Sequence, residues 1–182
     1  MIVLYIIGGI IVLWMIFTYN SFISIDNHVK KSFSGIDVQL KKRADLIPNL
    51  VSTVKGYMTH EKSVLTEVTK ARTEVLTAHD KEDVREMAKG QEHLTHALKS
   101  LFAVAENYPK LKANEHFLEL QNQLSRVEGQ IAASRRIYNS NVTMLNTKLS
   151  SFPSNIIGKL FGFKQKELFE SSEQDRAKPA SL

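Results

Sequence analysis

The chain opens with an uninterrupted apolar run, and no charged residue or histidine occurs before Asp26. Residues 1–17 read MIVLYIIGGIIVLWMIF and are almost entirely aliphatic or aromatic. As a helix, these seventeen residues extend roughly 26 Å, and residues 1–25 extend about 38 Å. That length is enough to cross a hydrocarbon core of about 30 Å. Tyr5 lies near one end of the run and Tyr19 near the other, as interfacial aromatic residues do. We therefore expect residues 1–25 to form a transmembrane anchor in contact with the lipid bilayer.

A cleavable signal peptide and a buried core helix are the alternatives for this run. A signal peptide has a basic start and a small-residue cleavage motif, and neither is present. Seventeen consecutive apolar residues are too many for one face of a core helix. Lys30, Lys31 and the cluster Lys41–Arg43 follow the run, whereas only the amino terminus precedes it. The positive-inside tendency predicts a single pass with the N-terminus outside and the following domain in the cytoplasm.

A helical apolar stripe continues from the anchor, with a mean step of about 3.6 residues. Its members are Phe22, Ile25, Val29, Phe33, Ile36, Leu40, Ala44, Ile47, Val51, Val54 and Met58, and it resumes at Leu65, Val68 and Val75. The pattern predicts one helix that runs to about Ala78. Pro48 interrupts it, but the apolar phase survives, which favours a kink over a turn. Gly56–Thr59 is a second weak point.

Two more helices follow, each with one apolar stripe. The stripe of the first is Val84, Met87, Gln91, Leu94, Leu98, Leu101, Ala105 and Tyr108, at a spacing typical of a coiled-coil seam. The stripe of the second is Phe117, Leu120, Leu124, Val127, Ile131, Tyr138, Val142, Leu145 and Leu149. We expect Asp80 and Asn114 to cap the two helices, and Pro109 and Pro153 to mark their ends.

The predicted fold is all-α, an elongated up-and-down bundle on a single N-terminal transmembrane helix. It contains three long helices, or four if the first breaks near Pro48 or Gly56. The expected organisation is an anchor at 1–25, a cytoplasmic helical bundle at 26–163 and a polar, disordered tail at 164–182. Within the bundle range, the glycine-broken segment Ile156–Phe163 either packs on the bundle, touches the membrane or binds a partner.

Composition and motifs argue against most kinds of chemistry. The net charge is +5, but lysine and arginine alternate with acidic residues, so we expect no nucleic-acid binding. The absence of cysteine excludes disulfides, thiolate metal sites and a cysteine nucleophile. No Glu-x-x-His, zinc-protease, phosphate-loop or G-x-S-x-G motif occurs. His60-Glu61 begins the zinc-protease pattern, but Val64 occupies the position of its second histidine.

The remaining polar candidates are assigned to structure. His93 and His96 lie beside a core stripe and are expected to be solvated or half-buried rather than metal ligands. Four carboxylates that could form catalytic pairs are expected to make helix ion pairs instead: Asp45, Glu61, Glu106 and Glu128. Polar residues on or beside the stripes are expected to fix the register of the helices: Arg43, Asn49, Glu106, Asn107, Glu128, Arg135, Tyr138, Asn139 and Asn141. We predict no catalytic, cofactor-binding or metal-binding residue, no cofactor and no small-molecule substrate.

Several of these segments resemble the LemA family of bacterial membrane proteins. They are Tyr19-Asn20, Asp37–Val51, Lys55-Gly56-Tyr57 with His60-Glu61, Ala105–Lys112, and Ala133–Asn139 through Asn146 to Phe152-Pro153. The resemblance covers residues 1 to 165 and leaves only the tail after Phe163 outside. It implies a helical bundle, usually of four helices, on an N-terminal anchor in the bacterial plasma membrane, without established enzymatic activity.

The expected function is therefore that of a membrane-anchored, non-enzymatic scaffold or interaction protein that self-associates or binds another membrane protein. An accessory or adaptor subunit of a membrane protease or secretion complex is the alternative, with Ile156–Phe163 as its docking segment. An enzyme with an unrecognised site is a third, less favoured hypothesis.

Overall fold

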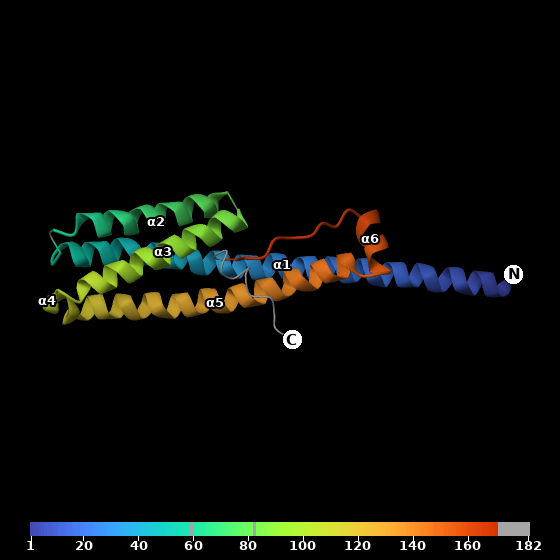
Figure 1. Cartoon of the computed structure of the whole chain (residues 1–182). Helices are drawn as coiled ribbons and strands as arrows, with labels where there is room; N and C mark the ends of the chain where they lie inside the picture. The colour runs from blue at the N-terminus through green and yellow to red at the C-terminus, as the bar shows by residue number, and fades with distance from the viewer. Residues whose placement is uncertain (59, 82, 171–182) are drawn as a thin grey trace, which may run out of the picture. The chain divides into compact units, whose positions relative to one another are not determined.

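A computed structural model describes residues 1–58, 60–81 and 83–170 (Figure 1). These residues form helices and no strand, so the all-α prediction is confirmed. The helices are α1 (Ile2–Lys55), α2 (Lys62–Asp80), α3 (Val84–Ala105), α4 (Pro109–Lys112), α5 (Glu115–Ser150) and α6 (Ser154–Leu160). The chain divides into two compact units, and α1 and α5 contribute to both. The first unit comprises Met1–Ser34 and Arg135–Leu168, and the second comprises the described residues of Gly35–Ser134 together with Phe169 and Glu170.

The second unit is an up-and-down bundle of four helical segments. They are the C-terminal part of α1, then α2 and α3, and the N-terminal part of α5, with the single turn α4 before it. The predicted stripes form its core, which includes Leu40, Leu94 and Leu124, each at most 2% exposed. The α2–α3 pair is particularly close, because a Cβ at Gly90 would lie only 3.2 Å from the Val75 backbone nitrogen.

The first helix is shorter than the periodicity predicted. It continues through Pro48 but ends at Lys55, and α2 begins at Lys62. The expectation of one helix to about Ala78 is therefore wrong. The break falls near Gly56, the second weak point, and the Val54 carbonyl accepts hydrogen bonds from the Tyr57 and Met58 amides there. The bundle thus has the four-helix form that the family resemblance implied.

Pro48 is tolerated because its missing hydrogen bond is replaced from another helix. Proline has no N–H to donate to the carbonyl four residues earlier, which here belongs to Ala44. The Arg72 Nε of α2 donates to that carbonyl at 2.9 Å. The carbonyl that Pro48 leaves unpaired in α1 is therefore used to bind α2.

The helix caps agree with the sequence at one position and differ at another. Asn114 Oδ1 accepts the Phe117 amide at 2.9 Å, which confirms the predicted cap of α5. Asp80, however, is the last residue of α2, and the cap of α3 is Asp83, which accepts the Arg85 and Glu86 amides. Asp80 and Asp83 both precede the apolar stripe of α3. The stripe of α2 extends to buried Ala78, so α2 continues to Asp80, where the sequence predicted the start of the next helix. Pro109 lies beyond the end of α3 and starts α4.

The first unit pairs the N-terminal part of α1 with the C-terminal part of α5 and carries α6. Phe22, Val29, Tyr138, Val142 and Leu145 are buried in it, all of them from the predicted stripes. After α6, residues 161–168 run without regular secondary structure. The predicted tail begins inside this segment, and its residues 171–182 lie outside the described part of the chain.

Candidate functional site

Among the described residues of the second unit, the most completely buried charged side chain is that of Arg43 in α1, which is 2% exposed. Its Nη1 donates to Thr95 Oγ1 of α3 at 2.9 Å, and its Nη2 lies 3.5 Å from Glu128 Oε2 of α5. Burial lowers the pKa of Arg43, and the Glu128 carboxylate opposes that effect. One side chain therefore connects three helices, as expected for a residue that fixes register.

A hollow of about 210 Å³ lies beside this guanidinium. Its polar lining includes Lys99, Gln121 and Ser125 in addition to Arg43, Thr95 and Glu128. Glu128 is half-exposed and already contacts Arg43, so the carboxylate serves as a counter-charge to a buried cation. This use matches the structural role predicted for Glu128.

His93 of α3 lies between two carboxylates of α2. Its Nδ1 is 2.6 Å from Glu74 Oε2, and its Nε2 is 2.5 Å from Glu67 Oε1. The hydrogen bonds with Glu74 and then with Glu67 raise the pKa of His93, although its partial burial acts in the opposite direction. When both ring nitrogens are protonated, both donate, and the ring holds α2 against α3.

His96 does not face His93 in a shared site. Its Nε2 lies 3.9 Å from Glu92 Oε1 one turn earlier in the same helix, and its side chain is 70% exposed. No group of three or more His, Cys, Asp or Glu side chains that could hold a metal occurs in the described residues. The Glu67–His93–Glu74 cluster was missed from the sequence, because its members belong to two helices whose relative register the sequence does not specify.

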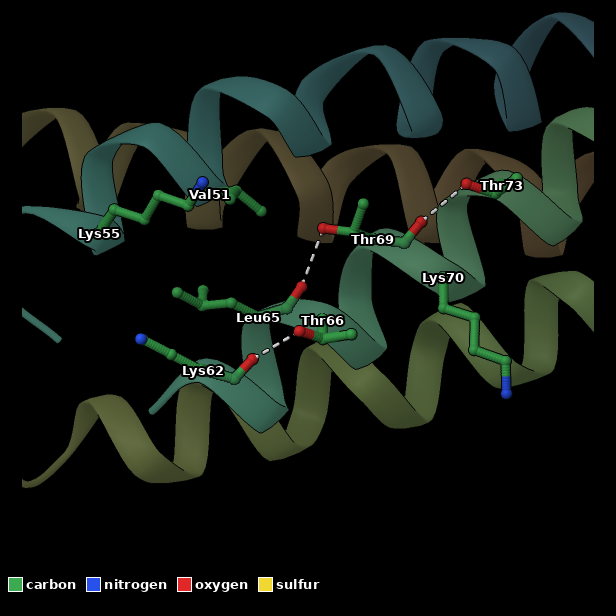
Figure 2. Close-up of a pocket in the computed structure, with 8 residues that line it drawn as sticks. All are labelled: Val51, Lys55, Lys62, Leu65, Thr66, Thr69, Lys70 and Thr73. Carbon is green, nitrogen blue, oxygen red and sulfur yellow. Dashed lines mark hydrogen bonds between the residues drawn. The ribbon is translucent and has the colours of Figure 1, made fainter. Parts of the chain in front are cut away.

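A larger hollow, of about 580 Å³, lies between α1 and α2 (Figure 2). Its wall carries three lysines, Lys55, Lys62 and Lys70, and three threonines of α2. The threonine hydroxyls donate to carbonyls one turn earlier in their own helix, at 2.8 to 3.0 Å. The hollow is therefore cationic, and its hydroxyl protons are already used within the helix.

The other predicted carboxylates make ordinary contacts. Asp45 lies 3.8 Å from Lys41 Nζ, in the i,i+4 pair that was expected. Glu61 accepts a 3.4 Å hydrogen bond from the Tyr108 hydroxyl. Glu106 is 66% exposed and pairs with Lys112. The prediction that Glu106 fixes register inside the bundle is therefore wrong, because the residue follows the end of α3 and faces away from the core.

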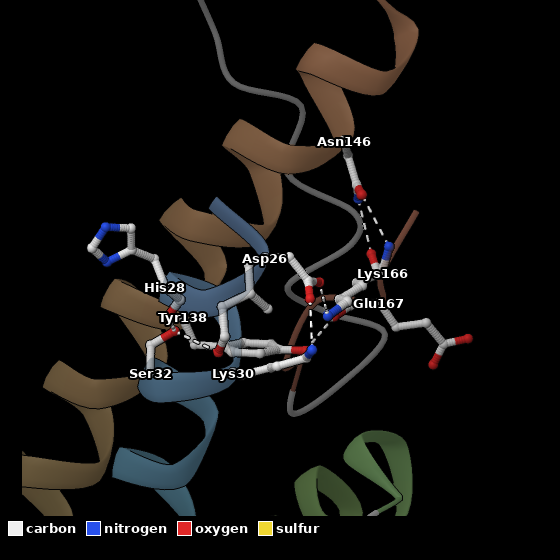
Figure 3. A network of polar contacts seen from close by, with 9 residues as sticks. Asp26, His28, Lys30, Ser32, Tyr138, Asn146, Lys166 and Glu167 are labelled. Carbon is white, nitrogen blue, oxygen red and sulfur yellow. Dashed lines mark hydrogen bonds and ion pairs between the residues drawn. The ribbon is translucent and has the colours of Figure 1, made fainter. Parts of the chain in front are cut away.

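A polar network in the first unit fastens the segment after α6 (Figure 3). Asp26 lies 2.8 Å from Lys30 Nζ and 2.5 Å from Lys166 Nζ. Burial acts to raise the pKa of Asp26, but hydrogen bonds and the charges of Lys166 and Lys30 lower it below its usual value. Asn146 donates to the Lys166 carbonyl at 2.8 Å and accepts its amide at 2.9 Å.

Two predicted polar residues belong to this same network. The Tyr138 hydroxyl donates to the Glu167 carbonyl at 3.0 Å, and Asn141 Nδ2 donates to Ser32 Oγ at 3.2 Å. Asp26 and Lys166 were not singled out from the sequence, because nothing in their spacing indicates that the chain returns past α1. Asn49, in the second unit, was expected to fix the register of the helices. It is exposed instead, so this prediction is wrong.

The start of α1 is the other distinctive feature. Its side chains up to Phe17 are almost all exposed, and Leu4, Ile10 and Phe17 are 76%, 61% and 70% exposed. In the described residues, α1 is the one helix that is long and apolar enough to cross a membrane. Such exposure of a continuous apolar surface is rare outside membrane or protein interfaces.

These features define a class: a helical protein whose N-terminal helix is a candidate membrane span and whose buried Arg43 connects three of its helices. Within that class, the chain belongs to the LemA family, which it matches over residues 32–181. The match starts after the apolar run and includes most of the tail, which we had expected to lie outside the resemblance.

Relatives share this match at low identity. Protein LemA of Metamycoplasma hominis is 26% identical over 158 residues, which cover 86% of this chain and 71% of the relative. Magnetosome protein MamQ 2 of Paramagnetospirillum magneticum is 23% identical over 179 residues, 86% of this chain and 66% of the relative. Magnetosome protein MamQ of Magnetospirillum gryphiswaldense is 21% identical over 178 residues, with 85% and 65% covered. The chain thus spans slightly less than two thirds of the length of the magnetosome proteins.

Proposed function

We propose that this protein is a membrane-anchored, non-enzymatic scaffold or interaction module of the bacterial plasma membrane, and that it self-associates there. The observation that carries the proposal is the exposed apolar surface of residues 1–17 on α1. A surface of this length and composition is stable when it lies in lipid. Residues 1–25 are the proposed bilayer contact, with the N-terminus outside and the helical domain in the cytoplasm.

The arrangement of the polar residues supports a role without chemistry. Arg43 and Tyr138 each bond to another segment of their own unit, and His93 joins α2 to α3. Groups used in this way stabilise the helices. The relatives named as magnetosome proteins support a membrane-associated role.

Self-association is supported by exposed apolar residues on α5. Ile137 and Met144 are 59% and 53% exposed and lie seven residues apart, hence on one face of the helix. Two copies anchored in the same orientation would present this face to each other. A partner membrane protein, including a protease or secretion complex for which this chain is an accessory subunit, is the alternative occupant.

Membrane attachment is tested by alkaline extraction and flotation of the full chain from native membranes. The protein should remain with the lipid fraction. Its recovery in the aqueous fraction after alkaline extraction would refute the anchor. Fusion of a reporter active only in the periplasm or only in the cytoplasm to the C-terminus tests the orientation.

Self-association is tested by cysteine crosslinking in native membranes, for which the natural absence of cysteine gives a clean background. The variants Ile137→Cys and Met144→Cys should form disulfide-linked dimers upon oxidation. Thr143→Cys is the matched control, because Thr143 is also exposed but points about 100° away from Met144 around the helix. Equal crosslinking of all three variants, or none from any, would contradict a specific contact between copies.

A further inference from the structure

The short helix α6 is packed on the part of α1 that directly follows the apolar run. Ile157 and Gly158 face inward and are buried. A Cβ at Gly158 would lie 2.6 Å from Leu149 Cδ2 and 3.5 Å from Phe22 Cζ. This glycine therefore allows α6 to lie directly against α1 and α5 within the first unit.

Three aromatic contacts fix the level of α6 along α1. The Phe161 ring centroid lies 4.7 Å from that of Tyr19. The Phe163 ring lies 6.0 Å from Tyr19 and is stacked on Phe22 at 4.9 Å. Tyr19 is two residues beyond Phe17, the last residue of the apolar run, which is about 3 Å along the helix axis. The end of α6 therefore lies beside the point where the run ends.

The outer side of this element is apolar and exposed. Phe152 is 81% exposed, Ile156 54%, Leu160 65% and Phe161 51%. Ile156 and Leu160 are four residues apart and so share one face of α6. These side chains extend the exposed apolar surface of α1 at the end of its apolar run. This is the level at which α1, as a transmembrane helix, would leave the hydrocarbon core.

Lysines accompany the apolar side chains at the same level. Lys159 lies in α6 and is exposed. Lys148 of α5 hydrogen-bonds to Ser21, and its Nζ lies 5.1 Å from the Phe22 ring centroid. Aromatic residues, aliphatic residues and lysines at one level are typical of elements that lie in the headgroup region, where the lysine ammonium groups contact lipid phosphates.

We propose that α6 and its flanks form an interfacial foot, in which Phe152, Ile156, Leu160 and Phe161 insert into the boundary between headgroups and acyl chains of the bilayer that α1 crosses. The inference depends on the proposed anchoring of α1. Lipid is the chosen occupant because the surface is continuous with that of α1, and because α6 carries Lys159 and no carboxylate. The glycine-broken segment Ile156–Phe163 thereby contacts the membrane while its buried side packs on α1.

The test uses tryptophan fluorescence of the full chain in phosphatidylcholine–phosphatidylglycerol vesicles whose acyl chains are brominated. Trp14 is the single tryptophan and lies in the proposed span, so the unmodified protein reports on the anchor. In a Trp14→Phe background, Phe161→Trp and Phe152→Trp report separately on the foot. Ile137→Trp in the same background is the control, an exposed position of the same unit, about 18 Å along α5 from Leu149.

Bromolipid should quench Trp14 and both foot variants and should leave the Ile137→Trp variant unquenched. Quenching of Trp14 without quenching of either foot variant would overturn the foot and leave the anchor intact. Absence of quenching at every position would overturn the anchor and the foot together. A blue-shifted but unquenched foot variant would indicate that protein covers this face, which also overturns the proposal.

A second set of variants separates lipid insertion from folding. Adding Ile156→Glu and Leu160→Glu to the Trp14→Phe/Phe161→Trp protein places two carboxylates on the outer face and leaves buried Ile157 and Gly158 unchanged. The circular dichroism spectrum should stay the same, whereas bromolipid quenching should be lost. Quenching that persists despite both carboxylates would overturn the assignment of this face to lipid.

Discussion

The ion pairs of His93 predict that the stability of the second unit depends on pH. We consider the substitution His93→Gln, which keeps a hydrogen-bonding side chain but cannot become a cation. The protonated ring bonds to Glu67 and Glu74 at 2.5 and 2.6 Å and joins α3 to α2. Lys70, Lys81, Glu86 and Lys89 also line the hollow beside it. The substitution removes both charged hydrogen bonds without opening the core.

The magnitude follows from the exposure of the partners. A hydrogen bond to a charged group contributes about 1.5–3 kcal/mol when shielded, whereas an exposed ion pair contributes about 0–1 kcal/mol. The side chains of His93, Glu67 and Glu74 are 29%, 49% and 43% exposed. Because solvent screens these partners, each of the two ion pairs is expected to contribute close to the value for an exposed pair. We therefore expect His93→Gln to lower the free energy of unfolding by about 1–2 kcal/mol in total. That loss corresponds to a decrease in Tm of a few degrees.

The sign of the pH dependence follows from the raised pKa of His93. Because the folded state holds the proton more tightly than the unfolded chain, the stabilisation is fully present below the unfolded pKa of about 6.5. It is lost as the pH rises through the higher pKa of the folded state. The difference in Tm between the natural protein and His93→Gln should therefore be large at pH 6 and should shrink in alkaline buffer.

Thermal unfolding followed by circular dichroism, in detergent and at several pH values, measures this difference. His96→Gln is the matched control, because His96 is 70% exposed and its distance to Glu92 is 3.9 Å. Its Tm should follow that of the natural protein at each pH. A His93→Gln difference that is constant with pH, or that grows with increasing pH, would refute the reasoning.

Three further predictions concern the second unit and are measured as free energies of unfolding. Arg43→Ala should cost about 2–5 kcal/mol, whereas Arg43→Met should cost less than about 1.5 kcal/mol, because it fills the space without a buried charge. Gly90→Ala should be neutral or destabilising by up to about 2 kcal/mol, because the added Cβ presses on the α2 backbone. Gly129→Ala should stabilise by up to about 1 kcal/mol, because its Cβ meets no atom within 4 Å and alanine favours the helix over glycine. Arg72→Met should cost about 1 kcal/mol, because it removes the hydrogen bond from Arg72 Nε to the Ala44 carbonyl. The cost should be clearly smaller in a Pro48→Ala background, where the amide of residue 48 can donate to that carbonyl, and equal costs in the two backgrounds would contradict this role of Arg72.

The sequence predicted the helices and their buried faces well, because both follow from local periodicity. The stripe from Phe22 to Val54 lies on the buried or half-buried side of α1 at every position, and Met58, just beyond the end of α1, is also buried. The end of α1 was misplaced, because the apolar phase of residues 65–75 happens to continue that of α1 across a real break. The phase of a stripe indicates which face is buried but does not show that the backbone is continuous.

The polar contacts were predictable only where one residue was conspicuous by itself. Arg43 stands beside an apolar stripe, so its burial was expected, but its partners Thr95 and Glu128 depend on how three helices pack. Asp26 and Lys166 are separated by most of the chain and meet because residues 164–168 return along α1 and α5. Such pairs are set by tertiary structure, which a single sequence does not reveal.

The distribution of polar and apolar groups supports the proposed function through a physical argument. A site for chemistry leaves reactive polar groups accessible and aimed at a common point, and such sites perturb pKa values for that purpose. In the described part of this chain, Glu74 and Glu67 of α2 raise the pKa of His93 in α3, and Lys166, together with Lys30 of the same helix, lowers the pKa of Asp26. The contacts with α2 and with Lys166 join separate segments. Exposed apolar surfaces among the described residues include the start of α1, the outer side of α6, and the Ile137–Met144 face of α5. Free energy is gained from such surfaces by burying them in lipid or against another helix, which supports the proposed association.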